Sequence, residues 1–483
     1  MRQGALSFKE KVAYGMGDAG CNMIWGTITL FLSYFYTDVF GLAPALVGVM
    51  LLSIRVVDAV SDPIMGAIAD RTQSRWGRFR PYLLWISLPF ALFSILMFST
   101  PDWSYSNKVI YAFVTYFLMS LTYTAINIPY CSLGGVITAD PQERVSCQSY
   151  RFFMVGIATL ILSSSLLPMA QWFGGADKAR GYQMSIAVMA FIALVMFLFC
   201  FSSVKERIQP AVPTKHALKS DLKDVWKNDQ WVRILLLTFC NVCPGFIRMA
   251  ATMYYVTWVM EKSTSFASLF ISLGVIGMMI GSALAKPLTD KFCKLKVFFW
   301  TNIILTLFSC GFYFLDPHMT VLILVAYFLL NILHQLPSPL HWSLMADVDD
   351  YGEWKTGKRS TGISFSGNLF FLKCGLAVAG AMVGFLLSIY GYQAGAASQT
   401  PHALNGIVLL FTVIPGVGYL MTAGVVRLLK VDRELMKTIQ ADLEIRRRNF
   451  SELNKGSELK GYPGEKQGET ERPAFASKEP KHE

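Results

Sequence analysis

Apolar stretches of about 20 residues alternate with short polar connections along most of the chain. A helix of about 20 residues crosses the roughly 30 Å of hydrocarbon in a bilayer, because each residue adds about 1.5 Å. We therefore expect an all-α membrane protein in which twelve helices span the bilayer. The expected spans are residues 12–37, 44–70, 81–100, 108–136, 148–171, 182–203, 233–260, 265–288, 297–315, 319–346, 363–390 and 404–428.

The composition agrees with this pattern. The 483-residue chain is 53% hydrophobic and only 16% charged, whereas about 25% of residues are charged in an average soluble domain. Its formal net charge of +11 does not indicate a nucleic-acid partner, because the basic residues lie in alternate connections between the apolar stretches. Lysine and arginine accumulate in cytoplasmic connections. We therefore expect a multi-pass protein of the bacterial inner membrane, surrounded by lipid, with both termini in the cytoplasm.

The chain also contains a weak internal repeat. The segment Gly66–Arg71 ends in Asp-Arg after the second span, and Leu284–Lys291 ends in Asp-Lys after the eighth. Repeats of six spans are typical of major facilitator transporters, whose substrate site lies between the halves near the middle of the membrane. We expect an N-terminal half at 1–203, a cytoplasmic linker at 204–232 and a C-terminal half at 233–430. The polar segment 431–483 is expected to be a largely disordered cytoplasmic tail.

Ionisable residues in the second span provide the first candidate site. A charge at the centre of a spanning helix costs about 2.5–3.5 kcal/mol, so it needs a partner or a water-filled cavity. Arg55, Asp58 and Asp62 share one helical face. The two carboxylates suit a hard monovalent cation, or a proton if burial raises a pKa. The alternative is a structural ion pair of Arg55 with Asp58. Lys373, about ten residues into the eleventh span, is a natural counter-charge.

Other polar and aromatic residues in the spans are candidates for binding a sugar. An acid can accept hydrogen bonds from hydroxyl groups, an arginine fork suits neighbouring hydroxyls, and aromatic rings can stack on a pyranose. Each also has a structural alternative: an ion pair for the acid, an interfacial anchor for the arginine, and helix packing for the aromatics. The candidates are Asp18, Asn22, Tyr123, Asn127, Arg151 and Trp342, with Thr124 beside them on the fourth span.

A third group of charges lies at the cytoplasmic ends of the spans. Arg144 follows the fourth span, and the acids after the tenth span include Asp350 and Glu353. We expect Arg144 to pair with this acidic group when the transporter is open outward and to separate when it opens inward. We expect such pairs to be exposed, so this gating contact should bias the equilibrium by only about 0.5–2 kcal/mol.

Nothing in the sequence supports an enzyme. It contains no nucleotide-binding loop, no HExxH metal motif and no triad-like spacing. The CxxC at Cys240 and Cys243 has no second cysteine pair or nearby histidine, which favours two buried thiols over a metal site. We expect no cofactor, a coupling ion that is Na⁺ or H⁺, and a protein that functions as a monomer.

Several motifs resemble those of the glycoside–pentoside–hexuronide:cation symporters, the melibiose permease family. The resemblance covers nearly the whole membrane portion. It rests on Tyr14-Gly-Met-Gly-Asp18, Phe35-Tyr-Thr-Asp38, the segment from Arg55 to Gly66, the segment from Arg75 to Pro81, Asn127-Ile-Pro-Tyr130 and Asp350-Tyr-Gly-Glu353.

The resemblance implies roles for matching positions. It implies that Asp58 and Asp62 bind the coupling cation with help from Thr124, and that Lys373 lies close by. It also implies that Asp18, Arg151 and Trp342 bind the sugar. The melibiose permease has an aspartate where this chain has Asn127 and a tryptophan where it has Cys131. This departure puts a melibiose-like galactoside in doubt. The Asn127-Ile-Pro-Tyr130 version resembles the branches that carry xylosides or glucuronides, so the resemblance implies a pentoside-type glycoside or a glucuronide.

Two other functions remain open at this point. A branch with the same architecture transports lysolipids or other amphiphiles, and an apolar central cleft poor in carboxylates would favour it. A membrane sensor that transports nothing is the other alternative.

Overall fold

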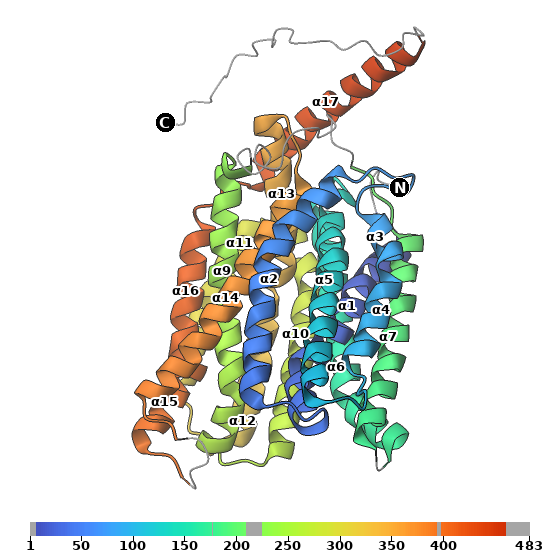
Figure 1. Cartoon of the computed structure of the whole chain (residues 1–483). Coiled ribbons are helices and arrows are strands. Elements are labelled where there is room, and N and C mark those ends of the chain that lie inside the picture. Colours follow the sequence, from blue (N-terminus) through green and yellow to red (C-terminus); the bar gives the residue numbers. More distant parts are fainter. Residues whose placement is uncertain (1–5, 176, 209–224, 394–397, 460–483) are drawn as a thin grey trace.

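The computed structural model describes residues 6–175, 177–208, 225–393 and 398–459. Within these ranges, the side chains of Leu30, Ser33, Asp38, Pro44, Ala45, Arg55, Val56, Thr264, Ser265 and 449–459 lie outside the described part. The regular structure of the described residues consists of helices that pack side by side in an elongated bundle (Figure 1).

The first half contributes six crossings of the bundle. They are α1 (Phe8–Tyr34), α2 (Pro44–Arg71), the pair α3 (Arg80–Trp85) and α4 (Ser87–Met97), α5 (Tyr105–Val136), α6 (Pro141–Gly174) and α7 (Lys178–Ser203). The expected third span is thus divided between two helices that meet at Ile86.

The second half contributes six more crossings. They are α9 (Asp229–Tyr254), α10 (Thr264–Lys291), α11 (Lys294–Phe312), the pair α12 (Thr320–Gln335) and α13 (Pro337–Thr356), α14 (Thr361–Ile389), and the pair α15 (Pro401–Phe411) and α16 (Val413–Val426). Among the described residues, nine helices are long enough and apolar enough to span a membrane, judged by length and composition alone. The chain then continues into α17 (Arg433–Leu459).

The end of the bundle where α17 lies is called the tail end below (Figure 1). Side-chain caps start several helices there. Ser7 and Glu10 form a capping box at α1, Asp140 caps α6 ahead of Pro141, and Asn228 caps α9. Each cap satisfies backbone N–H groups that the first turn of a helix leaves without a partner.

The two halves repeat each other closely at their first two helices. α2 and α10 begin at residues 44 and 264, 220 positions apart, and each has 28 residues. The turn before each is a π-helix, η1 (Phe35–Val39) and η2 (Tyr255–Val259). By this alignment, Met278 and Ser282 occupy the places of Asp58 and Asp62. The acidic pair therefore belongs to the first half alone.

Helices α2 and α14 join the halves at the tail end. Gly66 and Gly362 pack so closely that a Cβ atom on either would clash with the backbone of the other. One turn after Gly66, the Asp70 carboxylate accepts hydrogen bonds from the backbone N–H groups of Gly362 at 2.8 Å and Ile363 at 3.0 Å. The end of α2 thus caps the start of α14.

The expectation of a largely disordered tail at 431–483 was wrong for the residues of α17. The helix forms because Met436, Ile439 and Leu443 lie on one face and are buried against the bundle. The overall polar composition of this segment hid the apolar stripe. Residues 460–483 lie outside the described part of the chain.

Candidate functional site

The acidic pair of α2 is buried between the two halves. Asp58 is 2% exposed and Asp62 is fully buried. Lys373 of α14 reaches across from the second half, with its Nζ atom 2.7 Å from Asp62 Oδ2 and 3.5 Å from Asp58 Oδ2. The structure therefore brings together the three charges that the sequence suggested. The side chain of Arg55 lies outside the described residues.

Two hydroxyl groups of α5 complete this cluster. Thr124 Oγ1 donates to Asp62 Oδ1 at 3.0 Å, and Ser120 Oγ donates to Asp58 Oδ1 at 2.5 Å. Residues four apart lie on one helical face, so the pair on α5 matches the pair on α2. The cluster thus contains two carboxylates, two hydroxyls and one ammonium. No group of three or more histidine, cysteine, aspartate or glutamate residues that would suit a metal ion occurs in the described part of the chain.

A second ion pair lies inside the first half. Arg151 of α6 places its Nε atom 2.7 Å from Asp18 Oδ2 of α1, and both residues are at least 95% buried. Arg151 also donates to Gln148 Oε1 at 3.3 Å. This burial excludes the alternative in which Arg151 anchors its helix at the membrane interface.

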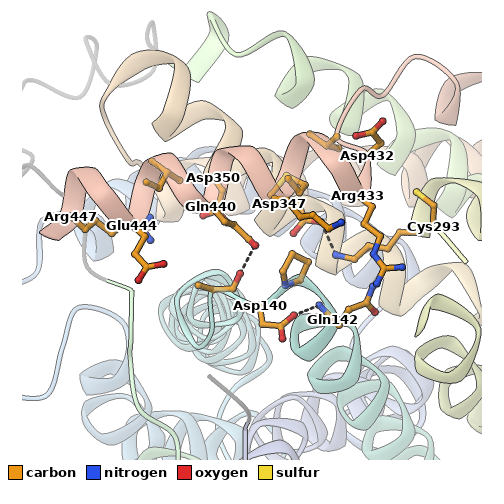
Figure 2. Close-up of a pocket in the computed structure, with 17 residues that line it drawn as sticks. Asp140, Gln142, Cys293, Asp347, Asp350, Asp432, Arg433, Gln440, Glu444 and Arg447 are labelled. Carbon is orange, nitrogen blue, oxygen red and sulfur yellow. Dashed lines mark hydrogen bonds and ion pairs between the residues drawn. The ribbon is translucent and has the colours of Figure 1, made fainter. Parts of the chain in front are cut away.

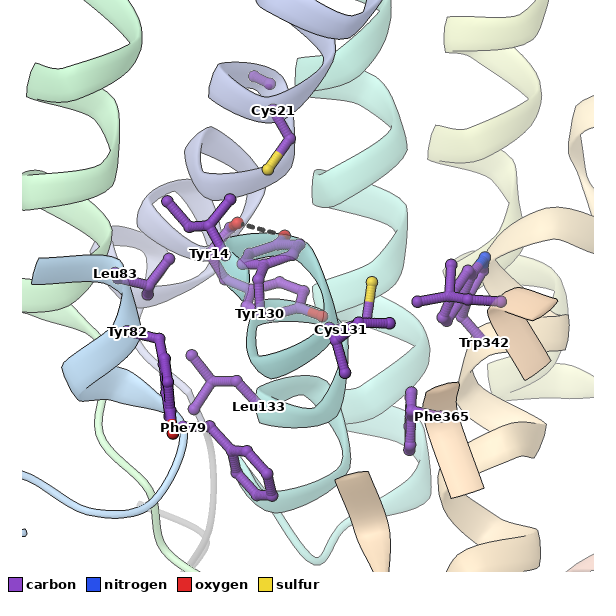
Figure 3. Packing of buried hydrophobic residues seen from close by; sticks show 14 of the residues in the cluster. Tyr14, Cys21, Phe79, Tyr82, Leu83, Tyr130, Cys131, Leu133, Trp342 and Phe365 are labelled. Atoms are coloured by element: carbon purple, nitrogen blue, oxygen red, sulfur yellow. Dashed lines mark hydrogen bonds between the residues drawn. The ribbon is translucent and has the colours of Figure 1, made fainter. Parts of the chain in front are cut away.

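The Arg151 guanidinium also contacts the second half. Its central carbon lies 4.4 Å from the ring centroid of Trp342 of α13 and 5.3 Å from that of Tyr130 of α5. The Tyr130 hydroxyl in turn donates to the Tyr14 carbonyl at 2.6 Å (Figure 3). The structure therefore brings Asp18, Arg151 and Trp342 together at the boundary between the halves, in a stack typical of cation–π contacts.

Three other candidates have partners of a different kind. The Asn22 amide donates to the backbone carbonyl of Asp18 at 2.9 Å, not to the Asp18 carboxylate. The Tyr123 ring stacks on Trp25, with ring centroids 4.4 Å apart. Asn127 is buried and accepts a weak contact from the Cys131 thiol at 3.7 Å.

Helix α5 connects the two clusters. Thr124, Asn127 and Cys131 follow one another at helical spacing along one side of α5. Thr124 contacts the acidic pair, and the Cys131 sulfur lies 3.6 Å from Arg151 Nη2. Helix α5 therefore contacts both clusters.

The charges at the tail end form the predicted contact in part. Arg144 is 1% exposed, and its Nη1 atom lies 3.0 Å from Asp347 Oδ1 and 2.7 Å from Asp350 Oδ2. Lys294 shares Asp347 at 2.7 Å. The two Arg144 pairs join the halves, and all of these residues are buried, so the expectation of an exposed contact was wrong.

Glu353 does not reach Arg144. It pairs with Arg359 at 2.8 Å and with Arg447 of α17 at 2.6 Å. Arg359 lies in the connection between α13 and α14. Burial works against its charge, but Asp349, Asp350 and Glu353 outweigh this effect and raise its pKa well above the usual value. Arg359 therefore stays charged and bridges these acids.

Sequence reasoning missed five residues that contact these clusters or join the two halves. Ser120 could have been found from its four-residue spacing to Thr124, and Gln148 from its position one turn before Arg151. Asp70 and Lys294 contact residues distant in the sequence, so no local pattern marks them, whereas Arg359 lies shortly after the acids that it bridges. The five residues are Asp70, Ser120, Gln148, Lys294 and Arg359.

Comparison with known proteins identifies the family. The model of the "MFS/sugar transport protein" family matches residues 13–433. The chain belongs to this family. Members of this major facilitator family are transporters, not enzymes. The expectation of a transporter is therefore confirmed at the level of the family.

Curated relatives of this chain are named as symporters and sugar transporters. The "Inner membrane symporter YicJ" of Escherichia coli is 45% identical over 423 residues, which cover 88% of this chain and 92% of the relative. The "Putative glycoside/cation symporter YagG" of the same organism is 38% identical, with 86% and 90% covered. The "Isoprimeverose transporter" of Lactiplantibacillus pentosus is 35% identical, with 91% and 92% covered. The resemblance to the glycoside–pentoside–hexuronide:cation symporters is confirmed.

Solved structures of other transporters share the fold of this chain. The Escherichia coli fucose:proton symporter FucP matches with a TM-score of 0.65, covering 87% of this chain and 98% of that one. At 13% identity this likeness shows the fold alone. The expected all-α architecture, with twelve membrane helices in two halves of six, is confirmed.

Proposed function

We propose that this protein is a cation-coupled symporter that imports a glycoside by alternating access. The observation that carries the proposal is the cluster of Asp58, Asp62 and Lys373 between the halves. Buried carboxylates are costly unless cations balance their charge. The Lys373 ammonium is shared by both carboxylates, and a monovalent cation, Na⁺ or H⁺, would take its place at one of them.

The surrounding oxygen atoms support a cation at this place. Carboxylate and hydroxyl oxygens are the ligands that hard cations prefer, and Ser120 and Thr124 add hydroxyls to Asp58 and Asp62. A bound cation would compete with Lys373 for the Asp62 carboxylate. Because Lys373 belongs to the other half, this competition ties cation binding to the relative position of the halves.

We assign the sugar to the second cluster. The Asp18 carboxylate and the Arg151 fork provide charged acceptors and donors for hydroxyl groups, and the Trp342 ring provides an apolar face for a pyranose. Asn127 and Cys131 lie on the adjoining side of α5 and are candidates for setting specificity. The name of the Isoprimeverose transporter relative supports a pentoside-type glycoside as the substrate, with glucuronides as the next class.

The buried charges weigh against the amphiphile alternative. An acyl chain would have to pass Asp18, Asp58 and Asp62, each at least 95% buried inside the bundle. A sugar, in contrast, supplies hydroxyl groups that can replace the hydrogen bonds of these side chains.

We also propose an orientation and a location. The tail end carries the basic connections after α2, α7, α10 and α13, so by the positive-inside rule it faces the cytoplasm of a bacterial cell. Both termini are then cytoplasmic. Each cluster is built from one chain, which supports function as a monomer.

Uptake into proteoliposomes tests the function. Purified protein would be supplied with radiolabelled xylosides, glucuronides and galactosides under an imposed Na⁺ or H⁺ gradient. We expect one class to accumulate above its external concentration, and an ionophore that collapses the driving gradient to abolish accumulation. Failure of every glycoside to move, while labelled lysolipid crosses, would favour the amphiphile alternative. Movement of neither would favour a sensor.

A further inference from the structure

Helix α17 lies across the tail end of both halves. A cavity of about 550 Å³ lies between part of this helix and the bundle (Figure 2). Residues of both halves line this cavity, Ala139 and Gln142 from the first and Lys294 and Asp347 from the second. The cavity therefore lies beside the Arg144–Asp347 ion pair, at the place where the halves must part for the bundle to open at this end.

Among the described side chains, three polar contacts fix α17 to the second half. Trp354 Nε1 donates to Asp442 Oδ2 at 2.8 Å, and Arg446 Nη1 donates to the Trp354 carbonyl at 2.9 Å. The Arg447 guanidinium lies 2.6 Å from the buried carboxylate of Glu353. Trp354 and Glu353 both belong to α13. Since α17 also follows α16 in the chain, it should move with the second half.

One hydrogen bond joins α17 to the first half in the described part of this contact. Gln440 Nε2 donates to the Ala139 carbonyl at 2.6 Å (Figure 2). Ala139 lies in the connection between α5 and α6, directly before the residue that caps α6. Beside it, Met436 and Leu443 are buried and line the roof of the cavity.

These contacts cannot all persist through alternating access. When the bundle opens at the tail end, Arg144 of the first half must leave Asp347 and Asp350 of the second. A helix held by Trp354 and Glu353 then moves away from Ala139. The Gln440 contact is thus made in the closed state and broken in the open state, and it is separate from the buried ion pairs.

We propose that α17 is a lid over the tail-end opening, anchored to the second half and latched to the first through Gln440 and Ala139. Closing the lid covers the Arg144 ion pairs and favours the state closed at this end. This inference goes beyond the proposed function but rests on its alternating access. Loss of the latch should leave the substrate and cation sites intact and raise the population of the open state.

Cross-linking separates the latch from the anchor. One variant carries Ala139→Cys with Gln440→Cys, which links the halves. The control carries Trp354→Cys with Asp442→Cys, which links α17 to its own half. In both, the half-buried native cysteines are replaced by serine: Cys240, Cys243, Cys293, Cys310 and Cys374. A short bis-methanethiosulfonate reagent forms the link, and a reductant removes it.

We expect the Ala139–Gln440 link to reduce glycoside uptake at least tenfold and the reductant to restore it. The Trp354–Asp442 link should leave uptake within twofold of the unlinked protein. An equal loss of uptake in both linked variants, or full uptake with the Ala139–Gln440 link in place, would contradict the proposal that α17 is a lid. Uptake by the unlinked protein reports on the proposed function separately.

A second measurement does not depend on transport. The native Cys293 lines the cavity under α17, so its modification by a maleimide, followed by peptide mass analysis, reports how often the lid opens. Gln440→Ala should raise the modification rate by roughly two- to tenfold, the equilibrium effect of losing one hydrogen bond. Ile445→Ala, on the exposed face of α17, should not change it. Equal rates in Gln440→Ala and wild type would contradict the lid even in a protein that transports nothing.

Discussion

The ammonium of Lys373 lies 2.7 Å from the carboxylate of Asp62 and belongs to the opposite half of the protein. Asp58, one turn before Asp62, lies 3.5 Å from the same ammonium. The same ammonium therefore contacts two carboxylates across the boundary between the halves. A cation that took its place at either carboxylate would change this contact, which gives the first prediction.

Replacing Lys373 should make the folded protein depend on the coupling cation. Lys373→Met leaves two buried carboxylates without their ammonium, and breaking a buried pair costs about 3–5 kcal/mol. We expect a lower unfolding temperature than in wild type. We also expect a larger recovery when Na⁺ is added or the pH is lowered, because ligands that bind only the folded state stabilise it.

Thermal unfolding of both proteins in Na⁺ and in N-methylglucamine, at matched ionic strength and two pH values, measures this recovery. An equal response of wild type and Lys373→Met to every condition would show that Lys373 does not share the carboxylates with a cation.

Substitutions at the proposed sugar site should weaken glycoside binding and leave cation binding unchanged. Asp18→Asn and Arg151→Gln each remove a charged group that we assign to a substrate hydroxyl, so each should weaken glycoside binding by about 1.5–3 kcal/mol. Arg151→Lys keeps a positive charge but loses the planar group that stacks on Trp342, and it should also bind weakly. Calorimetry with the transported glycoside measures the affinity. Unchanged affinity in all three variants would remove the assignment.

Charge reversal at Arg144 should open the tail end. Arg144→Glu places a third acid beside Asp347 and Asp350, and the buried contact is worth more than an exposed one, about 3–5 kcal/mol when one partner is lost. We expect the rate at which a maleimide labels Cys293 to rise well above that of wild type. A labelling rate equal to wild type would show that these pairs do not hold the end closed.

The contact between α2 and α14 should also favour the closed state. Asp70→Ala removes the cap on the first N–H groups of α14, a loss of about 0.5–2 kcal/mol. The internal repeat supplies a control, because Asp290 occupies the matching place on α10, is half exposed and pairs with Lys286 of its own helix. Asp70→Ala should speed the labelling of Cys293 and Asp290→Ala should not. Equal effects of the two substitutions would contradict a role for the cap.

Much of the membrane architecture follows from the sequence because the bilayer imposes strong constraints. Spanning helices need long apolar runs, so the runs alone predict twelve crossings. Buried charges are rare in such helices, so Asp58, Asp62 and Lys373 are conspicuous within the apolar runs of the sequence itself.

Other features depend on contacts that no local pattern reveals. Ser120 resembles any serine in an apolar helix until Asp58 is placed opposite it. Glu353 looks equivalent to Asp350, and both pair with Arg359, but only Asp350 also pairs with Arg144, whereas Glu353 pairs with Arg447 of α17. The helix α17 has a polar composition, and only docking on α13 buries Met436, Ile439 and Leu443. In each case tertiary packing decides what composition and spacing leave open.

The central claim is that a cation bound by Asp58 and Asp62 organises the adjoining sugar site. By linkage, the sugar must tighten cation binding by the same factor as the cation tightens sugar binding, typically about 5- to 150-fold or 1–3 kcal/mol. Asp62→Asn and Asp58→Cys should abolish this effect and uphill accumulation, while downhill exchange of sugar persists.

The most direct test measures glycoside affinity at low and high Na⁺, at two pH values, in wild type and in the Asp58→Cys, Asp62→Asn double variant. We expect wild-type affinity to rise with Na⁺ at fixed pH if Na⁺ is the coupling ion, or to change with pH alone if H⁺ is. The double variant should respond to neither. A double variant that still gains affinity with the cation, or still concentrates sugar against its gradient, would contradict the account.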